Sequence, residues 1–231
     1  MTMETSEPRP YVITYIATSL DGRIDGFPID LERFYGIAAR FEVDAILSGS
    51  ETAVVALERY AGVENTYDEG PAPERAPPGD TRPLFVVVDG RGRVLSWSVF
   101  QELPYWRGGM ALLSERVPES HRAYLASRNV DTLVVGDERV DLARALVRLR
   151  AAYGVRRVRV DSGGRLNGVL LRAGLIDEVH LLVCPWLVGG VGPRSAFADD
   201  LAAEGQGARL ERIGVEPFED GSVLLSYRVL G

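Results

Sequence analysis

The sequence predicts an α/β protein with a mostly parallel sheet and an antiparallel pair of strands near its C-terminus. Short runs rich in β-branched residues alternate with segments of helical periodicity, which is typical of a parallel sheet covered by helices on both faces. The last two apolar runs are joined through Pro217 and Gly221, which favours an antiparallel pair. The length of 231 residues and average shares of apolar (46%) and charged (26%) residues fit a single domain over 1–231.

The first elements follow from propensity and spacing. Tyr11–Thr18 concentrates β-branched and aromatic residues and is expected to be a strand. Ile29–Arg40 has apolar residues at helical spacing, with Asp30 as a candidate N-cap. Ala45–Leu47 predicts a short strand, and Glu51–Tyr60 predicts the helix that follows it.

The segment Ala61–Pro83 differs from its surroundings. It is rich in proline, glycine and acidic residues and has no apolar period. We expect it to form a flexible surface insert within the domain. A lid or rim over a site is the alternative, since long loops in compact domains often have such a role.

The second half of the chain continues the alternation. Strands are predicted at Leu84–Val88, Met110–Leu113, Thr132–Val135, Arg157–Val160 and Glu178–Val183. Helices are predicted at Pro118–Arg128, Asp141–Tyr153 and Gly164–Ala173. The last two strands are expected at Arg209–Val215 and Val223–Val229.

Composition excludes several classes of function. All 26 basic residues are arginine. Without lysine there is no Schiff-base chemistry and no Walker A phosphate loop. One cysteine and two histidines argue against a disulfide and a metal site. The net charge of −7 argues against binding to nucleic acid backbones.

The same composition bears on location. No apolar run reaches the roughly 20 residues that a membrane-spanning helix needs. The first ten residues are polar and acidic, without the apolar stretch of a signal peptide. We therefore expect a cytoplasmic protein with a small-molecule ligand and no membrane partner.

The most informative segment is Asp161-Ser162-Gly163-Gly164, which joins a predicted strand to a predicted helix. Ligands of parallel α/β sheets bind at the carboxyl ends of strands, and helix N-termini attract phosphates. Paired glycines would let a diphosphate approach the backbone closely. The alternative is a tight turn that needs glycine for its own geometry.

Several motifs in order resemble one known family. They are SLDGR after the first strand, LSGSET after the second, VVVDGRGRV along and after the third, DSGGRLN, and GLIDE. Together they are similar to the reductase domain of the bifunctional riboflavin biosynthesis protein and its stand-alone archaeal and fungal counterparts. The resemblance implies a dihydrofolate-reductase-like, three-layer α/β/α fold, NADPH as hydride donor, and a homodimer.

The resemblance also implies the reaction and the cofactor site. The substrate would be 5-amino-6-(5-phosphoribosylamino)uracil or the phosphate of 2,5-diamino-6-ribosylaminopyrimidinone, reduced at C1′ of the ribose. No general acid is evident, so a bound water could supply the proton. The residues at cofactor-contacting positions are Thr18, Ser50, Thr52, Asp89, Gly90, Arg91, Gly163, Gly164, Arg165, Leu166, Asn167 and Gly168.

Three of the charged candidates have an alternative role. Arg91 could contact the adenosine 2′-phosphate, or it could be a solvated surface arginine. Asp161 takes the place of a glutamate that contacts substrate, so it is the candidate catalytic and substrate-binding residue. Its alternative role is to cap the following turn. Arg40 could pair with a substrate phosphate, or it could only complement the C-terminus of its helix.

The chain also departs from the family pattern, and two other functions stay open. Thr52–Tyr60 lacks the Asp-Asp-Pro of riboflavin reductases, and Tyr15 stands where bacterial enzymes often have lysine. One alternative is therefore a reductase of a pterin or another small heterocycle on the same fold. Another is a non-catalytic nucleotide-binding or dimerisation module.

Overall fold

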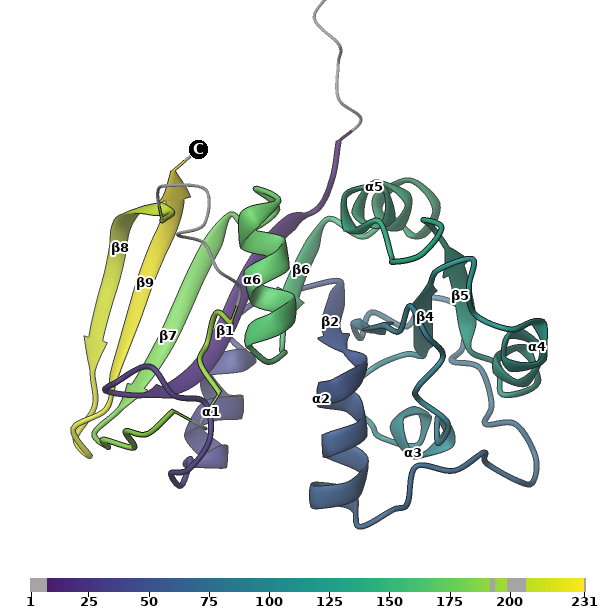
Figure 1. Cartoon of the computed structure of the whole chain (residues 1–231), viewed down its shortest axis with the longest axis horizontal. Helices are drawn as coiled ribbons and strands as arrows, with labels where there is room; N and C mark the ends of the chain where they lie inside the picture. Colours follow the sequence, from purple (N-terminus) through teal and green to yellow (C-terminus); the bar gives the residue numbers. More distant parts are fainter. Residues whose placement is uncertain (1–7, 192–193, 199–206, 231) are drawn as a thin grey trace, which may run out of the picture.

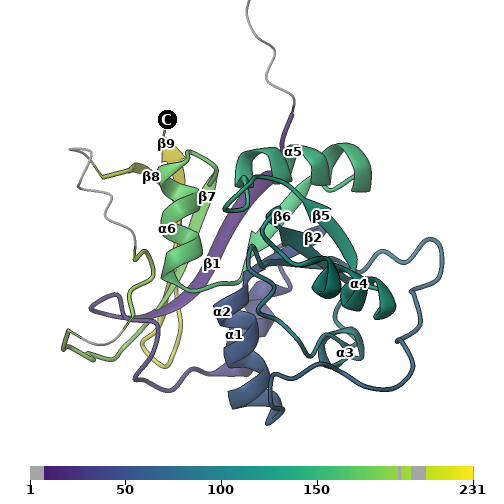
Figure 2. The same cartoon turned by 45° about the vertical axis from the view of Figure 1, so that its right-hand side comes forward.

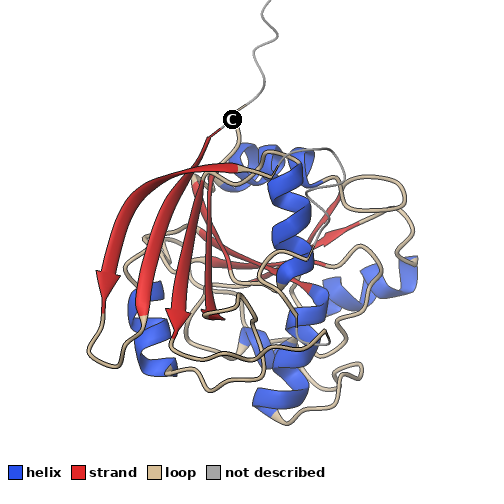
Figure 3. Ribbon diagram, turned by 60° about the vertical axis from the view of Figure 1, so that its left-hand side comes forward, coloured by secondary structure: helices blue, strands red, loops and turns tan. Residues whose placement is uncertain are grey.

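A computed structural model describes residues 8–191, 194–198 and 207–230. Its centre is a nine-stranded sheet in the order β5-β4-β3-β2-β6-β1-β7-β9-β8. The strands are β1 (Tyr11–Ser19), β2 (Ala45–Gly49), β3 (Leu84–Val88), β4 (Gly109–Leu113), β5 (Asp131–Val134), β6 (Arg157–Val160), β7 (Glu178–Cys184), β8 (Arg209–Pro217) and β9 (Val223–Leu230). The seven strands from β5 to β7 pair in parallel, whereas β9 pairs antiparallel with both β7 and β8. This confirms the predicted sheet, and Figure 3 shows its antiparallel end.

Helices cover both faces of this sheet (Figure 1, Figure 2). They are α1 (Leu31–Ala38), α2 (Ser50–Val55), α3 (Ser98–Gln101), α4 (Glu119–Ser127), α5 (Leu142–Tyr153) and α6 (Gly164–Arg172). One core packs α5 and α6 against β1 to β4 and β6, through Val12, Ala45 and Val158 among others. On the other face, α2, α3 and α4 pack over β2 to β4, and α1 packs over β1, β7 and β9. The three-layer α/β/α prediction is confirmed.

Strand register places α1 and α2 on the same face. Val12, Val158 and Ala45 align across β1, β6 and β2 and face α5 and α6. The neighbouring positions Ile46 and Arg159, which are also in register, therefore point to the opposite face, where α1 and α2 lie. Arg159 is thus a charged side chain on a central strand, beneath the two helices.

Two helices begin at a capping aspartate, as predicted for Asp30, and one helix differs from prediction. The carboxylates of Asp30 and Asp141 each accept a hydrogen bond at 3.0 Å from the backbone N–H three residues on. The helix expected over Glu51–Tyr60 is α2 followed by a π-helical turn, Ala56–Ala61, which ends at Gly62 with a φ of 65°. Helix α3 was not predicted, because four residues are too few to show a helical period.

The segment 61–83 makes ordered contacts with the rest of the chain. Asn65 donates to the Arg93 carbonyl at 2.8 Å and accepts from the Leu95 N–H at 2.9 Å. Asp68 Oδ2 accepts from the Ser98 N–H at 2.8 Å and from the Tyr124 hydroxyl at 2.9 Å. The first part of the insert therefore lies beside the loop that follows β3, while its flexibility stays a prediction.

None of the helices in the described ranges is both long and apolar enough to cross a membrane. The assignment of residues 1–231 to a single domain stays a prediction.

Candidate functional site

The predicted site residues gather where the central parallel strands end. Because β1, β6, β2 and β3 are neighbours and run parallel, their carboxyl ends meet at one edge of the sheet. Thr18 lies at the end of β1, Asp161 follows β6, Ser50 begins α2, and Asp89 follows β3. The fold thus brings these four residues to one edge of the sheet.

Hydroxyl groups tie the starts of α2 and α6 together. Ser162 Oγ accepts a hydrogen bond from the Gly49 N–H at 3.1 Å and lies 3.2 Å from Thr52 Oγ1. Thr52 Oγ1 in turn accepts from the Gly163 N–H at 3.2 Å. Gly163 at the N-cap of α6 provides no side-chain cap, so the first turn of this nine-residue helix keeps N–H groups for a ligand.

The two glycines at the start of α6 differ in how their surroundings restrict them. A Cβ at Gly164 would collide with the Ser195 carbonyl and the backbone of Ala198, whose N–H donates to the Gly164 carbonyl at 3.0 Å. A Cβ at Gly163 would meet only Ile24 at 3.6 Å and Thr52 at 3.7 Å, which are ordinary contacts. The φ of Gly163, −76°, is also open to any residue. Packing explains Gly164, whereas nothing in the described chain requires glycine at 163.

The remaining residues of the GGRLNG stretch differ in burial. Leu166, Asn167 and Gly168 are buried, and Asn167 Nδ2 donates to the Ala196 carbonyl at 3.0 Å. These residues anchor α6, so a cofactor contact from them would have to come from the backbone. Arg165 is exposed on 87% of its side chain and lies 3.7 Å from Glu51.

Arg91 lies on the turn that follows β3, and hydrogen bonds hold this turn in place. Asp89 is fully buried, and its carboxylate accepts from the N–H groups of Arg93 at 2.8 Å and Val94 at 2.9 Å. The Gly90 carbonyl accepts from the Ser114 hydroxyl at 2.6 Å. Asp89 therefore acts on the turn itself, while Arg91 is exposed and has no side-chain partner among the described residues.

A buried ion pair is the feature that the sequence did not reveal. Arg159 is only 6% exposed, and its Nε and Nη2 donate to Oδ1 and Oδ2 of Asp161, both at 2.7 Å. Its Nη1 donates to the Ala38 carbonyl at 2.6 Å. Burial alone lowers the pKa of the Arg159 guanidinium, but the hydrogen bonds and charge of Asp161 outweigh this and raise it. The signal for this ion pair in the sequence was Arg159 itself, a charged residue between two valines of a predicted strand.

Two neighbouring positions are engaged elsewhere. Tyr15 is buried, stacks on Phe34 at 4.6 Å and donates its hydroxyl to the Phe34 carbonyl at 3.1 Å. Arg40 forms a two-pronged pair with Glu216 of β8, at 2.7 and 3.2 Å. A phosphate at Arg40, as the sequence suggested, would share this guanidinium with the carboxylate or displace it.

Asp21 joins two loops at this edge. Its carboxylate accepts from the N–H groups of Val188 at 3.0 Å and Gly189 at 2.8 Å, and from the Ser19 hydroxyl at 2.7 Å. The Val188 N–H first, then Ser19 and Gly189, hold the pKa of this carboxyl well below its usual range. The SLDGR motif thus fixes the loop after β7 against the loop after β1.

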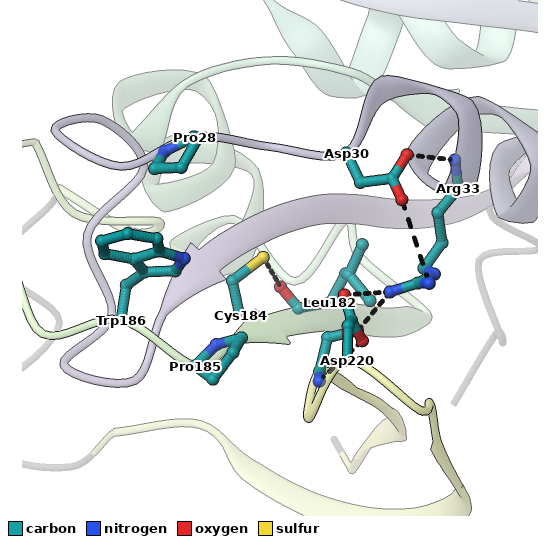
Figure 4. A pocket seen from close by; sticks show the side chains of 9 residues that line it. Pro28, Asp30, Arg33, Leu182, Cys184, Pro185, Trp186 and Asp220 are labelled. Atoms are coloured by element: carbon teal, nitrogen blue, oxygen red, sulfur yellow. Dashed lines mark hydrogen bonds and ion pairs between the residues drawn. The ribbon is translucent and has the colours of Figure 1, made fainter.

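A cavity of about 300 Å³ opens beside the end of β7 (Figure 4). Trp186, Cys184 and the start of α1 line it, and burial raises the pKa of the Cys184 thiol. Arg33, which also lines the cavity, forms ion pairs with Asp30 and Asp220. It also donates a hydrogen bond to the Ser222 hydroxyl at 3.1 Å. The charges in this cavity are therefore already paired. Within the described part of the chain, no group of three metal-ligating side chains is assembled.

The fold and the edge described above define a dihydrofolate-reductase-like protein. A dihydrofolate reductase from Enterococcus faecalis superposes with a TM-score of 0.50 and 9% identity, covering 96% of this chain and 97% of that one. RibD from Acinetobacter baumannii superposes with a TM-score of 0.70 and 25% identity, covering 96% of this chain and 58% of that longer chain.

Sequence comparison then gives the family. The family described as the RibD C-terminal domain matches residues 10–224, and the chain belongs to it. A relative from Methanothermobacter thermautotrophicus, named 2,5-diamino-6-ribosylamino-4(3H)-pyrimidinone 5′-phosphate reductase, is 34% identical over 195 residues. That match covers 81% of this chain and 83% of the relative. Membership and this relative together support an oxidoreductase.

Proposed function

We propose that this protein is an NADPH-dependent reductase of a ribosylaminopyrimidine phosphate in riboflavin biosynthesis. The observation that carries the proposal is the pairing of Gly163, which no packing contact explains, with the Asp161 carboxylate two residues before it. Gly163 would let a diphosphate approach the start of α6, and the Asp161 carboxylate could bind the donors of a heterocycle. The reductase named above, 34% identical, supports the same reaction class.

The chain's residues would bind and orient both molecules. The first-turn N–H groups of α6 would hold the diphosphate, and Arg91 would contact the 2′-phosphate. When bound, NADPH supplies the hydride. Asp161 would fix the pyrimidine ring so that C1′ of the ribose faces the donor. No described side chain at the edge is placed as a general acid, so water would protonate the ring oxygen as the sugar opens.

Cofactor binding can be tested separately from turnover. We expect a saturable change of NADPH fluorescence with the wild-type protein, and a weaker affinity for NADH. Arg91→Gln should reduce the preference for NADPH about tenfold or more, since a hydrogen bond to a charged group contributes ~1.5–3 kcal/mol. Arg148→Gln, an exposed arginine on α5, serves as the control. An absence of saturable binding at millimolar NADPH contradicts the proposal.

A second candidate is a reductase of a pterin or another small heterocycle without a phosphate. The Arg40–Glu216 pair favours it, because the cation expected to hold a substrate phosphate is already neutralised. Oxidation of NADPH in the presence of dihydropterins, with none on the ribosylaminopyrimidine phosphate, would establish this candidate. Oxidation with either compound dismisses the non-catalytic module.

We further propose a cytoplasmic homodimer. Apolar side chains of the C-terminal strands remain exposed, at 40% for Leu210, 41% for Ile213 and 52% for Val215. Exposed apolar side chains on an edge strand are one feature of interfaces between protein chains. The cytoplasmic location rests on composition alone.

A further inference from the structure

We propose that the first part of the insert, residues 64–68, sets the preference for NADPH over NADH by holding the turn that carries Arg91. Asn65 is the positioning residue in this arrangement. The inference rests on the proposed function, in which Arg91 contacts the 2′-phosphate that distinguishes the two cofactors. It assigns a role in cofactor selection to residues that belong to no helix or strand.

Side chains take up the backbone hydrogen bonds of residues 93–95, which follow this turn and belong to no strand. The buried Asp89 carboxylate accepts from the N–H groups of Arg93 at 2.8 Å and Val94 at 2.9 Å. Asn65 Nδ2 donates to the Arg93 carbonyl at 2.8 Å, and Asn65 Oδ1 accepts from the Leu95 N–H at 2.9 Å. The segment is therefore held by Asp89 from within the turn and by Asn65 from the insert.

The turn and the insert also rest on the same histidine. Gly92, next to Arg91, has a φ of 66°, which favours glycine, and its N–H donates to the Asp89 carbonyl at 3.1 Å. A Cβ at Gly92 would lie 2.8 Å from the buried His121 ring, so the turn packs directly on the imidazole. The hydroxyl of Tyr67, in the insert, lies 3.4 Å from Nδ1 of the same ring.

The insert is itself anchored on both sides of Tyr67. The Thr66 N–H donates to the hydroxyl oxygen of the fully buried Ser96 at 3.2 Å, and the Thr66 carbonyl accepts from that hydroxyl at 2.8 Å. Asp68 accepts from the Ser98 N–H at the start of α3, and the insert runs on past α3 and α4 (Figure 1). These contacts fix the backbone on which the Asn65 amide stands.

A fixed turn matters for the binding of a phosphate. Arg91 is exposed, and an arginine that binds a ligand loses side-chain freedom. If the backbone of the turn were mobile, its ordering would add to that cost. NADH lacks the 2′-phosphate and gains nothing from Arg91. The contribution of Asn65 therefore enters the preference between the two cofactors and not the affinity for the part that they share.

The test is a double-mutant cycle between Asn65 and Arg91, with dissociation constants of NADPH and NADH measured by fluorescence titration. Asn65→Ala should weaken NADPH binding about fivefold, since two hydrogen bonds to the turn are lost, and should leave NADH binding unchanged. In the Arg91→Gln background the same substitution should change neither constant. Thr66→Ala is the matched control, because the bonds of Thr66 to Ser96 come from its backbone.

Hydrogen exchange separates release of the turn from a loss of folding. In Asn65→Ala the Leu95 amide should exchange faster, while the amides of β3 keep their protection. Tyr124→Phe is a second release of the same segment, because the Tyr124 hydroxyl donates to the Leu95 carbonyl and the ring is kept. It should shift the cofactor preference in the same direction as Asn65→Ala.

The outcomes distinguish this inference from the proposed function. An unchanged preference in both variants keeps the proposed function and overturns the inference, as does an equal loss of affinity for NADPH and NADH. Additive effects in the cycle also overturn it, because Asn65 would then act without Arg91. A wild-type protein that binds neither cofactor overturns the proposed function and the inference together.

Discussion

At the scale of single residues, the predicted site residues fall into two groups: those that could contact a ligand and those that hold the site together. Asp89 and Asn167 hold turns and helices from the interior. Asp21 and Thr52 join neighbouring loops and helix starts. Gly163 is the position whose identity the described chain does not explain, which makes it the sharpest place to test for a cofactor.

The two glycines at the start of α6 give a matched pair of variants. Gly163→Ala should lower the melting temperature only slightly, because alanine is a poorer N-cap than glycine. It should weaken NADPH binding about tenfold, or ~1.4 kcal/mol, because the new methyl group meets the diphosphate. Gly164→Ala should lower the melting temperature much more, because its Cβ collides with the Ser195 carbonyl. Thermal unfolding and fluorescence titration of both variants check this, and equal behaviour of the two would contradict it.

Asp21 predicts how stability depends on pH. Its folded-state pKa lies below the unfolded value, so its stabilisation is present above the ordinary aspartate pKa of about 3.9 and is lost as the pH falls through the folded value. Asp21→Asn should therefore lower the melting temperature near neutral pH, and the gap to wild type should narrow in acid. Asp137→Asn, at an exposed carboxylate, should show no gap at either pH. A gap that is the same at all pH values would refute the assignment.

At the scale of elements, the site depends on loops that are fixed by a few hydrogen bonds. The insert 61–83 is the largest of them, and Asp68 connects it to α3 and α4 through the Ser98 N–H and the Tyr124 hydroxyl. These contacts lie beside the loop that follows β3. The interpretation of the insert as a rim over the site therefore stays open.

Removing the Asp68 carboxylate should release this part of the insert. In Asp68→Ala, backbone amides of residues 64–70 should exchange with solvent deuterium faster, because two hydrogen bonds to one oxygen are lost. Glu69→Ala, an exposed neighbour, is the control. Unchanged exchange in the Asp68 variant would mean that other contacts hold the insert.

At the scale of the whole molecule, the alternation of apolar runs predicted nearly every strand and helix. The order of strands in the sheet was beyond the sequence, because pairing between distant segments leaves no local pattern. Arg159 was missed for the same reason: its buried state depends on β1, β2 and α1, which lie more than a hundred residues earlier in the chain. Only its place between Val158 and Val160 was a local signal.

The exposed face of the C-terminal strands predicts the oligomeric state. Val215→Asp should convert a dimer into a monomer, because it puts a charge into an apolar interface. Val191→Asp, at a more exposed apolar position in the loop after β7, should leave the dimer intact. Light scattering coupled to size-exclusion chromatography measures both, and a wild-type monomer would contradict the proposal.

The position of β1 in the sheet has a consequence for synthesis on the ribosome. The first strand to emerge lies between β6 and β7, and its earliest partner, β6, begins only at Arg157. The strands β2, β3 and β4, in contrast, each pair with the next strand in the chain. Because distant pairings form slowly, the nascent protein must carry an apolar, unpaired N-terminal strand while most of the chain is made. We expect chaperones that bind extended apolar segments to recognise Tyr11–Ser19 during this interval.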